Sequence, residues 1–513
     1  MNVWQAAAIA AGVSLCASSV SAQKSKDTVR FPLNDPVQGV SYYEDPKTET
    51  VFETSGVYDT LISFDEDKGT FEPLLAKSFK RIDDKTLEFE MRDDATWHDG
   101  QKVTADDVVY TLNWILDPKT QIRFKNYWNW VDRVEKTGPS TIRIYAKQPT
   151  AFDLSMISFY TYIEAQHAHG KADDKVAYIR HPVGSSMYKV TKVDPAVGIT
   201  LEKNPAYKWG GTGKPASNVG KMELLFLPDS GTRIAKFLAG ELEILPKDTP
   251  LDQAEELAKH PDVELSIGQG TYYTYLAIDA KGRSGVKALT DVRVRKAIFM
   301  AVDRDELYHL TIGDHEVPRP EAMCWRSQGG CDYSVPLPKH DPEGAKKLLA
   351  EAGYPNGFDL VVSTFTNLEV AQKAEAIANQ LRKVGIRASV QKWTLGSYRD
   401  AQRDGKLQVF AGGWPGGGMP DVTATLAFIY SAPDTRDYHG DAELNKMAQD
   451  VDLIVDPEKR KALGRKVFDR STEMAYFMPT SPGPIIAVHT KDLAVRAGTM
   501  HSYGLDPWGL NWK

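Results

Sequence analysis

Alternating apolar and polar positions predict two short strands in the first third of the chain. Residues 85–91 and 141–147 alternate with a period of two, which is the period of a half-buried strand. Between them, residues 104–107 have the pattern of a helix capping box, and an apolar stripe at helical spacing follows. His98 and Asp99 precede a glycine, as in a turn. We therefore interpret this cluster of acids and one histidine as scaffold.

A second pattern, later in the chain, alternates strand-like and helical segments. The order is strand, helix, strand, helix, strand, which predicts a parallel sheet with right-handed crossovers. Ligands of open α/β sheets lie outside the carboxyl ends of the strands. Trp393 and Trp414 occupy two of these ends, and Gly416 and Gly417 follow in a loop that would let backbone approach a ligand closely. The five segments are residues 358–365, 368–384, 386–393, 397–404 and 407–414.

The length and the first residues indicate an exported protein with more than one lobe. The chain has 513 residues, above the ~250–300 at which single cores stop growing. Residues 1–22 carry no charged side chain, contain a short apolar run and end in Val-Ser-Ala, which predicts a signal peptide cleaved after Ala22. Leu15 before Cys16 disfavours a lipid anchor. We expect an exported protein without a further membrane segment.

Cysteine usage and charge narrow the class of protein. Cleavage would leave Cys324 and Cys331, which predict one short-loop disulfide in an exported chain; two buried or free thiols are the alternative. Neither cysteine has the close Cys or His partners of a zinc site. The formal net charge is -7, which argues against nucleic acid as a partner.

Motifs of catalysis are absent from the sequence. There is no HExxH, paired CxxC or GxSxG pattern. His167 and His169 form only a local pair, so we expect no metal site and no cofactor. A hydrolase using Ser185 would need a histidine base, and no spaced partner is evident. The enzyme hypothesis has no positive support.

Seven segments, taken in order, resemble the periplasmic solute-binding proteins of ABC importers, in the large peptide/opine/nickel class called family five. The resemblance implies an α/β periplasmic binding protein of type II (cluster C), with two lobes, a hinge and an extra α/β domain. Lobe 1 would comprise residues 23–61, 182–270 and 489–513; the extra domain would be residues 62–181, and lobe 2 residues 271–488. The matching segments are residues 57–61, 72–79, 97–112, 182–190, 290–307, 341–354 and 412–414.

The resemblance also implies where the ligand lies. In this family the strand end that bears Trp414 lines the cleft, with Trp393 nearby. In the peptide binders an acid three residues beyond that tryptophan takes the ligand's α-ammonium, and here the position is Gly417. A buried ammonium without an anionic partner is costly, so ordinary peptides are disfavoured. Asp421 would substitute if the loop rearranges, or else it caps the helix that follows.

Tyrosines from two segments add to the predicted site. Tyr273 and Tyr275, with neighbouring Tyr272, fall where the family crosses into the second lobe, and would form an aromatic wall or pack in a core. Tyr43 lies in an early loop that reaches the cleft in relatives. We expect a monomer that captures a small peptide-like or opine-like solute and delivers it to an inner-membrane ABC permease. Oligosaccharide binding, metal-chelate binding and presentation of ligand to a sensor are the alternatives.

Overall fold

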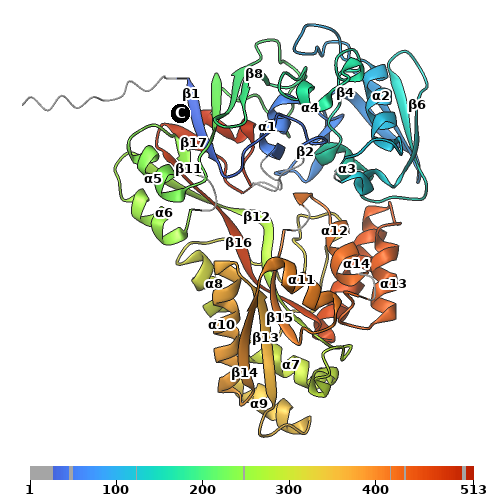
Figure 1. The fold of residues 1–513 in the computed structure, drawn as a ribbon. Coiled ribbons are helices and arrows are strands. Elements are labelled where there is room, and N and C mark those ends of the chain that lie inside the picture. Colours follow the sequence, from blue (N-terminus) through green and yellow to red (C-terminus); the bar gives the residue numbers. More distant parts are fainter. Residues whose placement is uncertain are drawn as a thin grey trace, which may run out of the picture.

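The computed structural model describes residues 27–45, 50–122, 124–245, 249–415, 418–431, 435–498 and 504–513. The expected signal peptide, Gly416 and Gly417 lie outside these ranges. Within them, no helix combines the length and apolar content needed to cross a bilayer. Figure 1 shows two parts stacked along the long axis, with the first half of the chain in the upper part and the chain from α7 to α14 in the lower part.

The upper part contains a four-stranded sheet in the order β1-β10-β9-β8. β1 and β10 run parallel, and the other pairs are antiparallel. The C-terminal residues return to this part as the pair β17–β18, which joins the same hydrophobic core through Leu493 and Leu510. The strands are β1 (Thr28–Leu33), β8 (Tyr188–Asp194), β9 (Gly198–Lys203), β10 (Lys221–Phe226), β17 (Leu493–Val495) and β18 (Leu510–Trp512).

An antiparallel sheet in the order β4-β5-β7-β6 lies in the predicted extra domain. The two predicted strands are β5 and β7, and the predicted helix is α2, so these three predictions are confirmed. The capping box is present: the Asp107 carboxylate accepts the backbone N–H of Thr104 at 2.8 Å. The elements are α1 (Thr50–Val57), β2 (Ile62–Asp65), β3 (Thr70–Pro73), β4 (Ala76–Asp83), β5 (Thr86–Met91), α2 (Ala105–Leu116), β6 (Val131–Lys136), β7 (Thr141–Ala146), α3 (Asp153–Tyr160) and α4 (Lys175–Tyr178).

A six-stranded sheet in the order β11-β16-β12-β15-β13-β14 forms the centre of the lower part and extends into the upper one. β13 lies between β14 and β15 and is parallel to both, which confirms the predicted strand–helix–strand block. The strands are β11 (Ile244–Leu245), β12 (Val263–Ile278), β13 (Asp359–Phe365), β14 (Arg387–Trp393), β15 (Val409–Trp414) and β16 (Phe477–Thr490).

β12 and β16 are the two long strands that pass from one part to the other (Figure 1). Their register shifts between Gln269 and Tyr273, which pair with Pro484 and Pro482. A proline has no N–H for the ladder, so pairing is weakest here, and a break of this kind suits a hinge. The predicted crossing at residues 270/271 falls in this break on β12. On β16, the position opposite this break is near Gly483, which is five residues before the predicted crossing at residues 488/489. The limits of the domains remain a prediction.

Helices cover both faces of the lower sheet. Successive residues of a strand point to opposite faces, and here the side chains on both faces are apolar and are buried by helices. Leu276 and Ile278 pack against α7, α9 and α10, whereas Tyr275 and Ala277 pack against α11, η5, α13 and α14. α5 and α6 cover the upper end of β11, β12 and β16. The helices are α5 (Ser230–Leu238), α6 (Leu251–Ala258), α7 (Val292–Ala301), α8 (Arg304–Ile312), α9 (Pro342–Glu351), α10 (Leu368–Lys383), α11 (Leu395–Arg403), α12 (Thr423–Thr425), η5 (Leu426–Tyr430, a π-helical turn), α13 (Ala442–Val451) and α14 (Pro457–Glu473).

Candidate ligand-binding site

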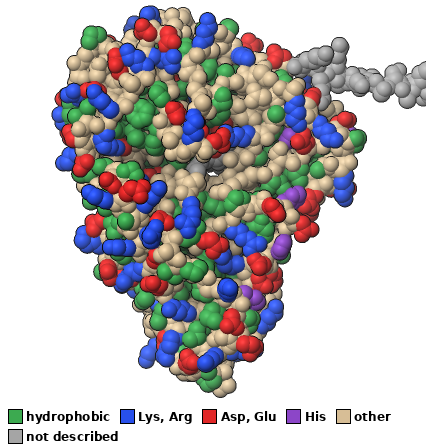
Figure 2. Space-filling view, turned by 180° about the vertical axis from the view of Figure 1, so that it is seen from behind, with side chains coloured by type: hydrophobic (Ala, Val, Ile, Leu, Met, Phe, Trp, Pro, Cys, Tyr) green, Lys and Arg blue, Asp and Glu red, His purple; other side chains and the backbone are tan. Residues whose placement is uncertain are grey.

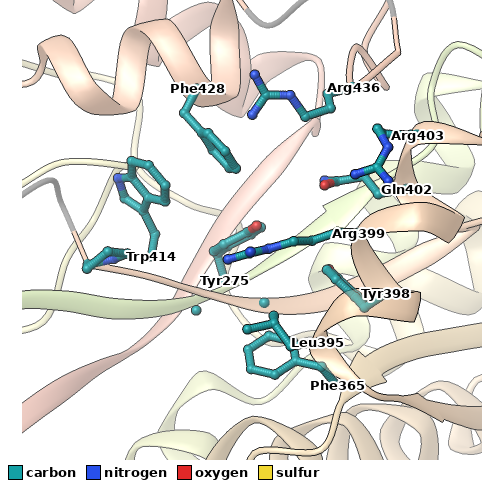
Figure 3. A pocket seen from close by; sticks show the side chains of 13 residues that line it. Tyr275, Phe365, Leu395, Tyr398, Arg399, Gln402, Arg403, Trp414, Phe428 and Arg436 are labelled. Atoms are coloured by element: carbon teal, nitrogen blue, oxygen red, sulfur yellow. The ribbon is translucent and has the colours of Figure 1, made fainter. Parts of the chain in front are cut away.

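A cavity of about 440 Å³ opens at the carboxyl ends of β13 and β15, between α11 and η5 (Figure 3). This is the position that the strand order predicts for a ligand. The surface is also hollowed where the two parts meet, as Figure 2 shows on the opposite face. The cavity is lined by Tyr275, Phe365, Leu395, Tyr398, Arg399, Gln402, Arg403, Gly412, Gly413, Trp414, Pro415, Phe428 and Arg436.

An aromatic stack forms one wall of the cavity. The rings of Trp414 and Phe428 lie with centroids 4.5 Å apart and planes 18° apart. The Trp414 indole N–H donates to the Thr425 hydroxyl at 2.8 Å, which fixes the ring orientation. Phe428 is 36% exposed, although a large apolar side chain is normally covered. The stack therefore offers apolar surface that a ligand can cover.

The two glycines before Trp414 make room for tyrosines on the adjacent strand. β12 pairs with β15 so that Tyr275 lies opposite Gly412. A Cβ atom at Gly412 would lie 2.7 Å from the Tyr275 ring carbon Cζ, and one at Gly413 would lie 2.0 Å from the Tyr272 hydroxyl. Only glycine fits at these two positions, because the rings occupy the space a side chain would take. Burial raises the pKa of Tyr275 to about 12, so its hydroxyl remains a donor.

Three arginines line the same cavity, and none of its described lining residues is acidic. Arg399 and Arg403 lie one turn apart on α11, and Arg436 follows η5. Arg403 pairs with Asp400, whereas no carboxylate among the described residues pairs with Arg399 or Arg436. The Arg436 guanidinium lies 4.5 Å from the Phe428 ring centroid, and burial lowers its pKa from the ordinary value. Arginine stays protonated in proteins, so the cavity is cationic.

The predicted tryptophans lie on either side of β13. Trp414 lines the cavity, whereas Trp393 ends β14 on the far side of Phe365, which pairs with it. The Trp393 indole N–H is buried without a hydrogen-bond partner among the described residues. The structure therefore brings Trp414 and Phe365 together at the cavity and leaves Trp393 beside it.

The predicted tyrosines divide in the same way. Tyr275 lines the cavity. Tyr273 is fully buried, and its hydroxyl donates to the Met323 carbonyl at 2.7 Å, so it packs in a core. Tyr43 is 2% exposed in the upper core, where its hydroxyl donates to the Tyr162 carbonyl at 2.7 Å. Neither Tyr273 nor Tyr43 belongs to the set that lines this cavity.

Asp421 lies in an ion pair rather than at the cavity. Its two carboxylate oxygens accept from the Arg460 guanidinium at 2.6 and 2.8 Å, and one also accepts the Thr423 backbone N–H at 2.9 Å. The side chains of Asp421 and Arg460 are 3% and 6% exposed. This geometry corresponds to the capping alternative, and it leaves no carboxylate oxygen directed at a ligand ammonium.

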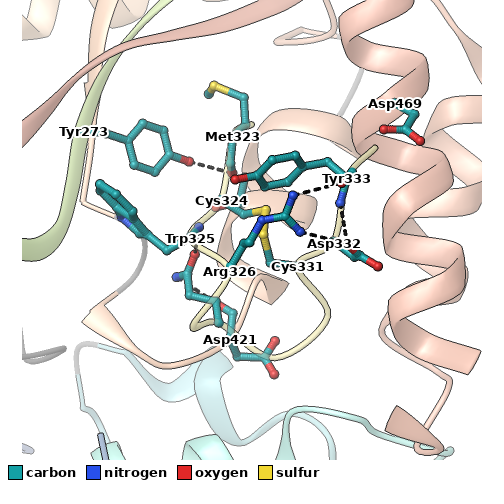
Figure 4. Close-up of a disulfide and its surroundings, with 12 residues drawn as sticks. Tyr273, Met323, Cys324, Trp325, Arg326, Cys331, Asp332, Tyr333, Asp421 and Asp469 are labelled. Carbon is teal, nitrogen blue, oxygen red and sulfur yellow. Dashed lines mark hydrogen bonds and ion pairs between the residues drawn. A yellow bond between two sulfur atoms is a disulfide. The ribbon is translucent and has the colours of Figure 1, made fainter. Parts of the chain in front are cut away.

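The structure contains the predicted disulfide between Cys324 and Cys331, with Cα atoms 5.9 Å apart (Figure 4). The loop it closes is tied to the segment after the cavity, because Gly329 donates to the Pro420 carbonyl at 2.8 Å and accepts from Val422 at 3.1 Å. The Tyr273 hydroxyl bonds to the Met323 carbonyl beside it (Figure 4). The disulfide thus braces the loop that follows Trp414.

His98 and Ser185 have structural partners. The His98 Nε2 atom lies 3.0 Å from the Ser186 carbonyl, and burial lowers the histidine pKa to about 4. The Ser185 hydroxyl is fully buried and accepts the Asp59 backbone N–H at 3.2 Å. This geometry gives the hydrolase hypothesis no activated nucleophile.

Sequence reasoning missed Arg399, Arg403, Arg436 and Phe428. Arg399 and Arg403 are four residues apart and therefore share a helix face, which is a signal that the sequence contains. No sequence pattern near Arg436 or Phe428 indicates that these residues would line the same cavity as Arg399 and Arg403.

Comparisons with known proteins identify the class. Residues 70–436 match the family described as bacterial extracellular solute-binding proteins, family 5 Middle. Heme-binding protein A of Haemophilus influenzae is 28% identical over 400 residues, covering 71% of this chain and 70% of that protein. Glutathione-binding protein GsiB of Shigella boydii is 24% identical over 94% of each chain. The structure of the ABC transporter substrate-binding protein CtaP from Listeria monocytogenes aligns with a TM-score of 0.82 at 19% identity, over 95% of this chain and all of that one.

The fold, with two strands crossing between two α/β parts, is that of a type II periplasmic binding protein. The chain belongs to family 5 of the bacterial extracellular solute-binding proteins. Members of this family are the solute-binding components of ABC importers; they bind and deliver solutes and are not enzymes.

Proposed function

We propose that this chain captures a small organic anion with an aromatic or extended apolar group, and delivers it to the permease of an ABC importer. The cavity beside Trp414 carries the proposal, because it combines an aromatic wall with three arginines, and none of its described lining residues is acidic. We also propose that residues 1–22 are a signal peptide that directs export, and that the mature chain acts as a monomer in the periplasm.

Charge separates the candidate ligands. A carboxylate in the cavity would accept charge-assisted hydrogen bonds from Arg399 or Arg436, each contributing about 1.5–3 kcal/mol. Figure 3 shows Arg399 extending from α11 toward Tyr275 in the middle of the cavity. A neutral oligosaccharide would stack on the aromatic wall but would bring no negative charge to the arginines, and an ammonium group would be repelled by them. Heme, named in the description of one relative, carries two carboxylates; glutathione, named in that of another, carries two carboxylates and one ammonium and is a net anion.

The test uses the mature chain, residues 23–513, stripped of ligand by partial unfolding and refolding. Titration calorimetry compares N-acetylated dipeptides ending in phenylalanine or tryptophan with the same compounds as carboxamides. The proposal expects the acids to bind at least about tenfold tighter, since tenfold corresponds to 1.4 kcal/mol. Equal affinity of acid and amide, or tighter binding of free-amino carboxamides, would overturn it.

Arg399→Gln is the matching variant and Arg387→Gln its control. Arg387 is an exposed arginine on the same sheet whose side chain pairs with Asp359 at 2.7 Å, away from the cavity. Arg399→Gln should weaken binding of the acids and leave the amides unchanged, whereas Arg387→Gln should change neither. If Arg399→Gln weakens acid and amide alike, the arginine contributes shape rather than charge, and the anion proposal fails.

A further inference from the structure

A buried cluster of possible metal ligands lies in the upper part, away from the cavity. The side chains of Glu44, Glu164 and His169 each offer one ligand atom, and these atoms lie within 4.8 Å of one another. The segments that supply them are the early loop, the stretch after α3 and the turn before α4. Sequence analysis did not anticipate this cluster, because the three residues belong to separate segments.

The cluster is almost closed to solvent. The His169 side chain is fully buried and that of Glu44 is 9% exposed, while Glu164 is 1% exposed. The backbone N–H of Glu164 donates to the Thr111 hydroxyl at 2.9 Å, and this bond fixes Glu164 against α2. Carboxylates are rarely buried without a partner, since removing a charge from water is costly.

One oxygen in the cluster lacks the partner that burial requires. Glu164 Oε2 is buried and forms no hydrogen bond of ordinary geometry among the described residues, although the Tyr58 hydroxyl lies beside it. The Lys175 ammonium is the nearby cation, but its Nζ donates to the carbonyls of His169 and Ala172. The cluster therefore brings two carboxyl groups together in a buried place and leaves one of their oxygens without an ordinary hydrogen bond.

The histidine is oriented as a ligand would be. His169 Nε2 lies 3.1 Å from Glu44 Oε1, and Nδ1 lies 2.6 Å from the Tyr110 hydroxyl. A metal-bound histidine uses one ring nitrogen for the ion, while its other N–H is held by a hydrogen-bond acceptor. Tyr110 is placed to accept from Nδ1, which would leave the Nε2 lone pair directed at the carboxylates.

We propose that Glu44, Glu164 and His169 form a binding site for a divalent transition-metal cation, with Zn²⁺ as the probe. One imidazole and two carboxylates at bond lengths of about 2.0–2.2 Å suit zinc, with a fourth position for water or the Tyr58 hydroxyl. The Tyr58 hydroxyl is likewise buried and forms no hydrogen bond of ordinary geometry among the described residues. The cation would join the early loop to the extra domain, independently of the ligand in the cavity.

The test measures Zn²⁺ binding to the chelator-treated mature chain by calorimetry and by metal content after gel filtration. Glu164→Gln removes one ligand while keeping the side-chain shape. Glu255→Gln is the matched control, because Glu255 and His315 form a surface pair at the same kind of distance, 3.0 Å, without a third ligand. Binding of one Zn²⁺ per chain is expected, and Glu164→Gln should weaken it more than about tenfold, the lower limit for losing a partner that only supports a ligand.

The unfolding temperature supplies a second measurement that does not depend on one variant folding well. Zn²⁺ should raise it in the wild-type chain and in Glu255→Gln, and a chelator should reverse the rise. Glu44→Gln should abolish the effect as Glu164→Gln does. Absence of Zn²⁺ binding by the wild-type chain would overturn the proposal and leave a Tyr58–Glu164 hydrogen bond as the explanation of the buried carboxylate. Equal binding by Glu164→Gln would also overturn it.

Discussion

The ion pair between Asp421 and Arg460 gives the sharpest test of how the loop after Trp414 is held. Asp421→Asn keeps the side-chain oxygen that accepts from Thr423 but removes the charge. At pH 8, where Asp452 is ionised, the Arg460 guanidinium is then left buried with Asp452, 3.5 Å away, as its remaining anionic partner among the described residues. Breaking a buried pair costs about 3–5 kcal/mol, and the remaining partner places the expected loss near the lower value, about 3 kcal/mol.

The assay is thermal unfolding followed by circular dichroism, with the lower part treated as one cooperative unit. A loss of about 3 kcal/mol corresponds to a fall of about 6–12 °C in the midpoint of a unit of this size. Arg460→Met should cost a similar amount, because it leaves Asp421 buried. The double variant should recover more than half of either loss, since no unpaired charge remains.

Two outcomes would refute this reasoning. An unchanged midpoint for Asp421→Asn would mean that the pair contributes no net stability. A double variant that loses the sum of the two single losses would mean that Asp421 and Arg460 are not coupled. The same variants test the ligand role: if Asp421→Asn selectively weakens binding of free-amino peptides, Asp421 takes the ligand's ammonium despite its pairing here.

Three further predictions concern the same part of the molecule. Gly413→Ala should destabilise it by about 1–3 kcal/mol in denaturant unfolding, because the new methyl group would overlap the Tyr272 ring; an unchanged midpoint would show that the ring moves freely. Reduction of Cys324–Cys331 should cost about 2–3 kcal/mol from loop entropy, measured by unfolding with and without reductant, and a Cys-to-Ser pair should match the reduced chain. Burial raises the pKa of Asp452 to about 7 from 3.8, so folding stability should fall as pH rises from about 4 to 7. Asp452→Asn should therefore be more stable than wild type at pH 8 and equal to it near pH 4; the opposite order at pH 8 would contradict the raised pKa.

Local patterns gave most of the fold. The alternating strands, the capping box at Thr104 and the strand–helix–strand block all depend on side-chain period and helix caps, which neighbouring residues define. The long strand β16 was not expected. It contains Pro479, Pro482 and Pro484, which disfavour a strand when read locally, and it persists because β12 pairs with it along most of its length.

Contacts between residues far apart in the sequence decided which side chains line the cavity. Trp414 was predicted from its place at a strand end, and its partner Phe428 and the arginines around it were not. Asp421 forms an ion pair with Arg460 on α14. The two residues are 39 positions apart in the sequence, so no local motif could predict the pair. Tyr43 entered the core because Trp114 and Trp128 pack on it.

By itself, the sequence determined the class of fold, the parallel block, the short disulfide loop and the family. The parallel block depends on periodicity and helix caps, and the disulfide loop on cysteine spacing, all of which act over a few residues. The family, and the fold class that it implies, depend on the resemblance of seven segments taken in order. Only the tertiary structure decided that the cavity is cationic, that Tyr43 and Asp421 are not among its described lining residues, and that Glu44, Glu164 and His169 converge. These features arise where separate segments pack together, and burial then fixes which polar groups find a partner.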